Sequence, residues 1–243
     1  MVVALDFDHL APALDLAGKL AGIAGLFKIG KQLFTAEGPE AVRRVSQLGP
    51  GVFLDLKYHD IPNTVVGAVR AAAAIGGVRL LNIHTLGGPK MMAEAAAALK
   101  EFPNPPKLLG VTILTSIDAK MMTKVGISGT PASRVLRLAK LAKQAGLDGV
   151  VASTHEVKAI KKACGKDFLV VVGGTRPKNE AVAHGSQLRG GLKRDDQSRM
   201  ATPAEAVRAG ADYLVVGRPI TGAADPVAAA MAIAEEIARA ESE

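Results

Sequence analysis

The chain has 243 residues, of which 49% are hydrophobic, and its 30 Lys and Arg against 23 Asp and Glu give a net charge of +7. No stretch reaches the ~18 uncharged apolar residues of a membrane span, so a membrane protein is not expected. The positive charge suits an anionic ligand, whereas dispersed basic residues, two Tyr and no Trp argue against nucleic-acid binding.

Short apolar runs alternate with longer Ala-rich amphipathic stretches along the whole chain. This pattern predicts eight strands, at Val2–Asp8, Leu26–Gly30, Val52–Lys57, Leu80–His84, Leu108–Leu114, Gly149–Ser153, Phe168–Gly173 and Tyr213–Gly217. It predicts helices at Pro39–Leu48, Thr64–Ile75, Lys90–Lys100, Pro131–Gln144, His155–Cys164, Pro203–Ala209 and Pro226–Ala240. Eight hydrophobic strands separated by helices favour a parallel sheet closed into a (β/α)8 TIM barrel, a single domain over residues 1–243.

Several single residues mark where these elements end. Thr202 and Asp225 are predicted helix N-caps, and Gly146 and Gly210 are predicted left-handed C-caps. Pro177–Asp196 is long and polar and has no periodicity, which is typical of a functional or disordered loop.

The first residues indicate a cytoplasmic protein. The start Met1-Val-Val-Ala-Leu-Asp6 places an acidic residue in what would be the apolar region of a signal peptide, and it lacks a basic beginning. The only cysteine, Cys164, ends a helical pattern without an evident base partner, and we interpret it as a structural thiol.

Charged residues gather where the predicted strands end. In a TIM barrel, the active site lies at the carboxyl ends of the strands. Asp55 and Lys57 are two residues apart, so a strand would place both side chains on one face. A structural ion pair at the barrel rim would explain these two residues. Lys28 and Asp6 on adjacent strands add two more alternating charges, which stability alone explains less well.

Residues 52–64 resemble the signature of the orotidine 5′-monophosphate decarboxylase family, an apolar pair followed by D-x-K-x-x-D-I-P-N-T. Further similarities occur at Ala4–Asp6, Phe27–Gly30, Val111–Ser116, Asp196-Gln197 and Ala211–Thr221. Related barrels share D-x-K-x-x-D, so Lys28 and the later Val-Gly-Arg-Pro-Ile-Thr add the specificity. The resemblance implies decarboxylation of orotidine 5′-monophosphate to uridine 5′-monophosphate, the final step of pyrimidine nucleotide synthesis, with no cofactor and no metal.

The resemblance also implies a role for each residue of the charged group. Decarboxylation leaves a carbanion at C6 of the pyrimidine, and without an electron sink only preorganised charge can stabilise it. Lys57 would donate the proton to C6, and Asp55 would lie near the departing carboxylate. Whether Asp55 acts by repulsion or by orienting Lys57 is left open. Lys28 would hold Asp55 and a ribose hydroxyl, and Asp6 would accept a ribose hydroxyl.

Two residues of the motif are expected to act in a second subunit. In the family, the second Asp and the Thr of the motif reach into the partner's site. Asp60 and Thr64 would therefore act in trans, which implies a homodimer.

The phosphate side has an independent argument, because barrels often bind phosphate with the loops after strands seven and eight. Here those loops begin at Arg176 and at Gly217-Arg218, which offer planar donor forks and a closely approachable backbone N–H. By resemblance, Gln197 bridges phosphate and base, and Thr115 or Ser116 contacts the pyrimidine.

This phosphate side also departs from the family. Val172–Arg176 reads V-G-G-T-R where T-P-G-I-R is usual, and 20 residues separate Arg176 from Gln197 in a long loop at about 175–200. The loop's Arg189, Lys193 and Arg194 either supplement phosphate binding or lie on a solvated surface excursion.

Two histidines near the strand ends are not assigned to catalysis. His59 is interpreted as an interface or supporting residue, and His84 as a hydrogen-bonded rim residue.

Two other functions compete with decarboxylation. A magnesium-dependent enzyme acting on a sugar phosphate would carry an acidic ligand where Lys28 stands, and Lys28 would repel the metal. A non-catalytic nucleotide-phosphate binding protein would need Gly217 and Arg218 but not Lys57.

Overall fold

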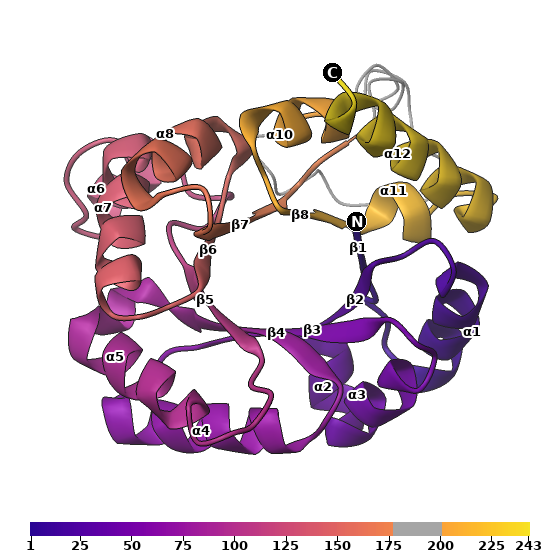
Figure 1. The fold of residues 1–243 in the computed structure, drawn as a ribbon, viewed down its shortest axis with the longest axis horizontal. Helices are drawn as coiled ribbons and strands as arrows, with labels where there is room; N and C mark the ends of the chain where they lie inside the picture. The colour runs from indigo at the N-terminus through magenta and orange to yellow at the C-terminus, as the bar shows by residue number, and fades with distance from the viewer. Residues whose placement is uncertain (177–200) are drawn as a thin grey trace.

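The computed structural model describes residues 1–176 and 201–243. Its eight strands are all parallel and close into a barrel in sequence order (Figure 1). The strands are β1 Val2–Ala4, β2 Leu26–Gly30, β3 Gly51–Tyr58, β4 Val78–His84, β5 Lys107–Val111, β6 Gly149–Ala152, β7 Leu169–Gly173 and β8 Tyr213–Val216. The predicted TIM barrel is confirmed. A single domain over all of 1–243 stays a prediction, since part of that range lies outside the described residues.

Helices surround the barrel on its outer side (Figure 1). They are α1 Leu10–Leu20, α2 Lys31–Glu37, α3 Pro39–Ser46, α4 Pro62–Ala74, the 3-10 helix η1 Thr85–Gly87, α5 Gly88–Leu99, α6 Ala119–Lys124, α7 Pro131–Gln144, α8 Thr154–Cys164, α10 Pro203–Ala209, α11 Arg218–Thr221 and α12 Pro226–Glu241. Within the described residues, no helix combines the length and the apolar composition needed to cross a membrane.

The predicted helix caps at Thr202, Asp225 and Gly210 are confirmed. The side chain of Thr202 accepts a hydrogen bond from the backbone N–H of Glu205 within a capping box, and Asp225 accepts two backbone hydrogen bonds at the start of α12. Gly210 caps α10 in the left-handed conformation. The C-cap of α7 is Ala145, and Gly146, with a φ of 85°, follows it, one residue beyond the C-cap position predicted for it.

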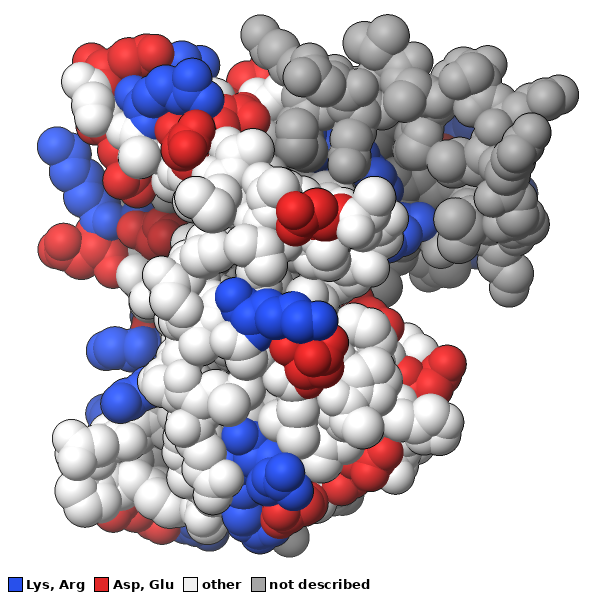
Figure 2. Space-filling view, turned by 90° about the vertical axis from the view of Figure 1, so that its right-hand side faces the viewer, with Lys and Arg blue, Asp and Glu red and all other residues white. Residues whose placement is uncertain are grey.

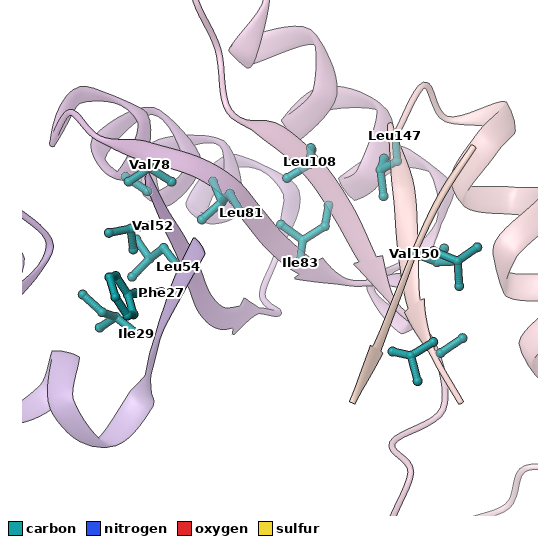
Figure 3. Packing of buried hydrophobic residues seen from close by; sticks show 14 of the residues in the cluster. Phe27, Ile29, Val52, Leu54, Val78, Leu81, Ile83, Leu108, Leu147 and Val150 are labelled. Carbon is teal, nitrogen blue, oxygen red and sulfur yellow. The ribbon is translucent and has the colours of Figure 1, made fainter. Parts of the chain in front are cut away.

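Two hydrophobic layers hold the strands in place. The outer layer fills the space between barrel and helices, and Figure 3 shows part of it, including Phe27, Ile29, Leu54, Leu81 and Ile83. The inner layer fills the barrel with Val2, Leu26, Phe53, Leu80, Leu109 and Val171. Because side chains alternate along a strand, adjacent residues such as Phe53 and Leu54 belong to different layers. The inner layer closes the barrel beneath its carboxyl end.

The surface charge is mixed on the face shown in Figure 2. On the described part of that face, Lys and Arg lie among Asp and Glu and between broad uncharged areas, and they do not form a continuous basic surface there. Cys164 is buried at the end of α8, where burial raises the pKa of its thiol and the nearby Lys143 and Lys140 oppose that rise. Both observations suit the structural interpretation of this cysteine.

Candidate active site

A cavity of about 310 Å³ opens at the carboxyl ends of the strands. On β2 and β3, the residue two positions beyond the inner hydrophobic layer lines this cavity, so one face of each of these two strands changes from apolar to charged. Lys28 follows Leu26 in this way, and Asp55 follows Phe53. The lining includes eight of the residues selected from the sequence, namely Asp6, Lys28, Asp55, Lys57, Thr115, Arg176, Gly217 and Arg218.

The four predicted charges form a continuous network on β2, β3 and the loop after β1. Lys28 Nζ lies 2.9 Å from Asp6 Oδ1 and 3.6 Å from Asp55 Oδ2. Lys57 Nζ lies 2.5 Å from Asp55 Oδ1. The alternation of signs therefore continues from strand to strand, with Asp55 between two ammonium groups.

The surroundings of Asp55 keep it ionised although its side chain is only 13% exposed. Burial alone would raise the pKa of this carboxyl. The charges of Lys28 and Lys57, with hydrogen bonds from Lys57 and Asn82, outweigh burial and hold the pKa below its usual range. Gly30 leaves room for the network, because a Cβ there would lie 3.0 Å from Lys28 Nζ and 3.2 Å from Asp6 Oδ1.

The spacing of Asp55 and Lys57 predicted that a regular strand would bring their side chains together. The strand is instead irregular at this point. In the β3–β4 ladder, Leu54 pairs with Leu81 and Tyr58 pairs with Ile83, so three residues of β3 lie opposite one residue of β4. Lys57 has a φ of 53°, and it is the only non-glycine residue with positive φ in the described chain. The bulge turns the Lys57 ammonium back onto Asp55.

The opposite rim carries the predicted phosphate-binding groups. Arg176 follows β7, is 9% exposed, and donates its backbone N–H to Ala201 O. Gly217 and Arg218 follow β8 at the start of α11. Gln197 lies outside the described residues, as do Arg189, Lys193 and Arg194.

Comparison with known proteins identifies the family of this site. Residues 1–233 match the family model described as "Orotidine 5'-phosphate decarboxylase / HUMPS family". The chain belongs to this family. It is 52% identical to a protein of Trichlorobacter lovleyi and 50% identical to one of Moorella thermoacetica, each named "Orotidine 5'-phosphate decarboxylase". These matches cover 98% of this chain in both cases, and 94% and 91% of the respective relatives.

Solved structures agree with this family membership. The chain superposes on the crystal structure of orotidine 5'-phosphate decarboxylase from Lactobacillus acidophilus with a TM-score of 0.80 and 37% identity, covering 98% of both chains. The resemblance drawn from the motifs is therefore confirmed over nearly the whole chain.

Two predicted residues of the family motif do not line the cavity. Asp60 and Thr64 are both exposed at the start of α4. Asp60 Oδ1 accepts the backbone N–H of Ile61 at 2.6 Å, and the Ile61 side chain is 68% exposed. The structure thus places these residues on a partly apolar surface beside the site.

The two histidines excluded from catalysis lie together at the rim. The rings of His59 and His84 stack with centroids 5.1 Å apart. Burial, followed by the nearby His59, Lys57 and Lys31, lowers the pKa of His84 to about 4, so this ring is neutral at pH 7. His84 Nδ1 accepts the backbone N–H of Leu86 at 3.4 Å, which suits the predicted hydrogen-bonded rim residue.

A magnesium-dependent enzyme, the alternative considered above, would need side chains arranged to bind the metal ion. In residues 1–176 and 201–243, no group of three or more His, Cys, Asp or Glu is arranged to hold a metal ion. The carboxylates of Asp6 and Asp55 both face Lys28 Nζ. A cation between them would have to displace that ammonium.

One residue of the site was missed in the sequence. Asn82 on β4 is fully buried and hydrogen-bonds both Asp55 and the backbone of Lys57. The available signal was a single amide within the apolar run Leu80-Leu-Asn-Ile83. Its partners could not be named without the register between β3 and β4.

Proposed function

We propose that the chain decarboxylates orotidine 5′-monophosphate to uridine 5′-monophosphate without a cofactor or metal, as a cytoplasmic enzyme of pyrimidine synthesis. The observation that carries this proposal is the placement of Asp55 between Lys28 and Lys57 at the cavity. The shared name of the closely similar relatives supports the same substrate.

The network suits a reaction in which negative charge develops on carbon. The bond from C6 to the carboxylate breaks, CO₂ leaves, and the electron pair stays on C6. The Lys57 ammonium stabilises that pair and then donates its proton to C6. Asp55 holds the ammonium in position next to the departing carboxylate. This chemistry uses charges that are in place before the substrate binds.

The other lining residues would hold the nucleotide. Asp6 would accept a hydrogen bond from a ribose hydroxyl, Lys28 would donate one, and Thr115 would contact the pyrimidine; all three residues line the cavity. Arg176, Gly217 and Arg218 would bind the 5′-phosphate, joined by Gln197. Remote phosphate binding can then position C6 against Lys57.

We further propose a homodimer in which Asp60 and Thr64 complete the partner's site. Their exposure outside their own cavity, next to the exposed Ile61, supports this arrangement. Mixing Asp60→Ala with Lys57→Ala subunits should restore partial activity, because one of the two sites in each heterodimer is intact. Verified subunit exchange without recovery would refute the shared site.

The proposed reaction is tested by following orotidylate decarboxylation through its absorbance change, with and without a chelator. Turnover should be unaffected by exhaustive chelation. Activity that requires magnesium would instead favour a metal-dependent enzyme of the same barrel type. Tight binding of a nucleotide analogue without any turnover would favour a binding protein.

A further inference from the structure

We propose that Asn82 is a positioning residue that fixes Lys57 and Asp55 relative to each other, an inference that rests on the proposed function. Asn82 Nδ2 donates to Asp55 Oδ1 at 2.7 Å. Its Oδ1 accepts the backbone N–H of Lys57, also at 2.7 Å. One side chain from β4 therefore connects the carboxylate and the main chain of the proposed proton donor.

The bulge in β3 explains why a side chain is needed at this point. Asp55, Leu56 and Lys57 lie together opposite Asn82, so the regular ladder between Leu54 and Tyr58 is interrupted. A backbone N–H removed from a ladder needs another acceptor, and for Lys57 the Asn82 carboxamide supplies it. This hydrogen bond holds Lys57 in a left-handed conformation that non-glycine residues rarely adopt.

The two partners also fix the orientation of the carboxamide. The Lys57 N–H can only donate, and the ionised Asp55 carboxylate can only accept, so the Asn82 oxygen and nitrogen each have one possible direction. Asp55 Oδ1 thus receives Asn82 and Lys57 Nζ, while Oδ2 is directed toward Lys28. Rotation of the carboxylate would break these contacts together.

Packing alone does not account for an amide at position 82. Leu80, Leu81 and Ile83 on the same strand are apolar and buried, and Asn82 is 0% exposed. A leucine has the same branching and the same number of side-chain heavy atoms, but it would leave the Lys57 N–H without this acceptor. The phosphate-side residues belong to other strands, so a change at Asn82 should affect the reacting groups more than substrate binding.

The decisive experiment compares Asn82→Leu with Thr112→Val in the full-length protein. Thr112 is equally buried and donates one side-chain hydrogen bond, but its acceptor is Val151 O at 2.8 Å rather than a residue of the charged network. Asn82→Leu should lower kcat by about 10²-fold, with a much smaller change in KM. Thr112→Val should keep kcat. If both variants keep kcat per folded molecule, the proposal is wrong.

The pH dependence separates positioning from a purely structural role. Loss of the Asn82 donor removes one contact that favours ionised Asp55, so the acid limb of the kcat profile should move to higher pH in Asn82→Leu. Asn82→Asp, which places a second carboxylate beside the first, should move it further. These shifts are expected even if Asn82→Leu is less stable, and an unchanged profile in both variants would overturn the proposal.

A measurement without turnover distinguishes this inference from the proposed function. The carboxyl ¹³C shift of Asp55 can be titrated in the free wild-type protein and in Asn82→Asp and Asn82→Leu. Titration at higher pH in the variants would support the positioning role even if orotidylate were not the substrate. Unchanged titration alongside normal wild-type turnover would refute the role of Asn82 and leave the proposed function intact.

Discussion

The two halves of the cavity rim differ in which charged residues line them. On the β1–β4 half, Asp6, Lys28, Asp55 and Lys57 alternate in sign and contact one another. On the β5–β8 half, the charged lining residues are Arg176 and Arg218, and the acidic residues of the described lining all belong to the first half. The first half is organised internally, whereas the second is suited to an anionic group of a ligand.

The first half holds its charged groups in place before a ligand binds, whereas the second half offers cations to bind one. Charged groups that already hold one another need little rearrangement when charge develops during a reaction, which makes them effective in stabilising a transition state. Arginines that line a cavity attract phosphate but do not by themselves favour one bond-breaking step. We therefore expect substitutions in the first half to change mainly kcat, and substitutions in the second half to change mainly KM.

The largest expected effect breaks the preorganised half. Lys57→Ala should lower kcat by several orders of magnitude, because it removes both the proton donor and a charge near C6, and general acid catalysis alone contributes about 10²–10⁴-fold. Steady-state decarboxylation measures the loss. Lys19→Ala is the matched control, since Lys19 pairs with Asp15 at 2.7 Å on the surface of α1. Retention of near wild-type turnover would contradict the proposed proton donor.

A smaller effect is expected on the phosphate side. Arg218→Ala should raise KM by roughly 10- to 100-fold, the range expected for a charge-assisted hydrogen bond, and should change kcat less. Arg208→Ala on α10 provides a control, because Arg208 contacts Glu243 on the surface. A drop in kcat with unchanged KM would show that the division between the two halves is wrong.

The sequence predicted the first half well because its information is local. Apolar residues at Leu26 and Phe53 followed two positions later by Lys28 and Asp55 specify both the barrel interior and the charged mouth. The strand ends were less accurate: β1 ends at Ala4 rather than at Asp8, and β5 ends at Val111 rather than at Leu114. Asp6 and Thr115 consequently lie in loops.

The missed features depend on contacts between strands or on short segments. A left-handed Lys57 has no compositional signal, since glycine is the residue that usually marks such a conformation. The contacts of Asn82 depend on the register that sets it opposite the β3 bulge, and this register could not be predicted from the sequence. Among the described α-helices, no bounds were predicted for α1, α2, α6 and α11, and three of these have seven residues or fewer, too short for a clear helical period.

The smallest expected effect concerns His84, whose ring borders the preorganised half without joining its ion pairs. Its pKa is about 4 in the folded protein against 6.5 for the free side chain. Between these values the unfolded chain binds a proton that the folded chain does not, so stability falls as pH decreases from 6.5 toward 4. Above pH 6.5 this penalty is absent, and below pH 4 it no longer grows.

Urea unfolding at several pH values between 7 and 4 tests this dependence. His84→Gln should lose less stability than the wild type as pH falls through the window, whereas His155→Gln, an exposed control on α8, should follow the wild-type slope. Asp55, whose pKa is lowered, loses its contribution only at still lower pH, so the two groups can be separated. Parallel slopes for His84→Gln and the wild type would mean that folded and unfolded His84 bind the proton at the same pH, so that the ring becomes charged beside Lys57 below pH 6.5. The first half would then carry an additional positive charge that its internal balance does not include.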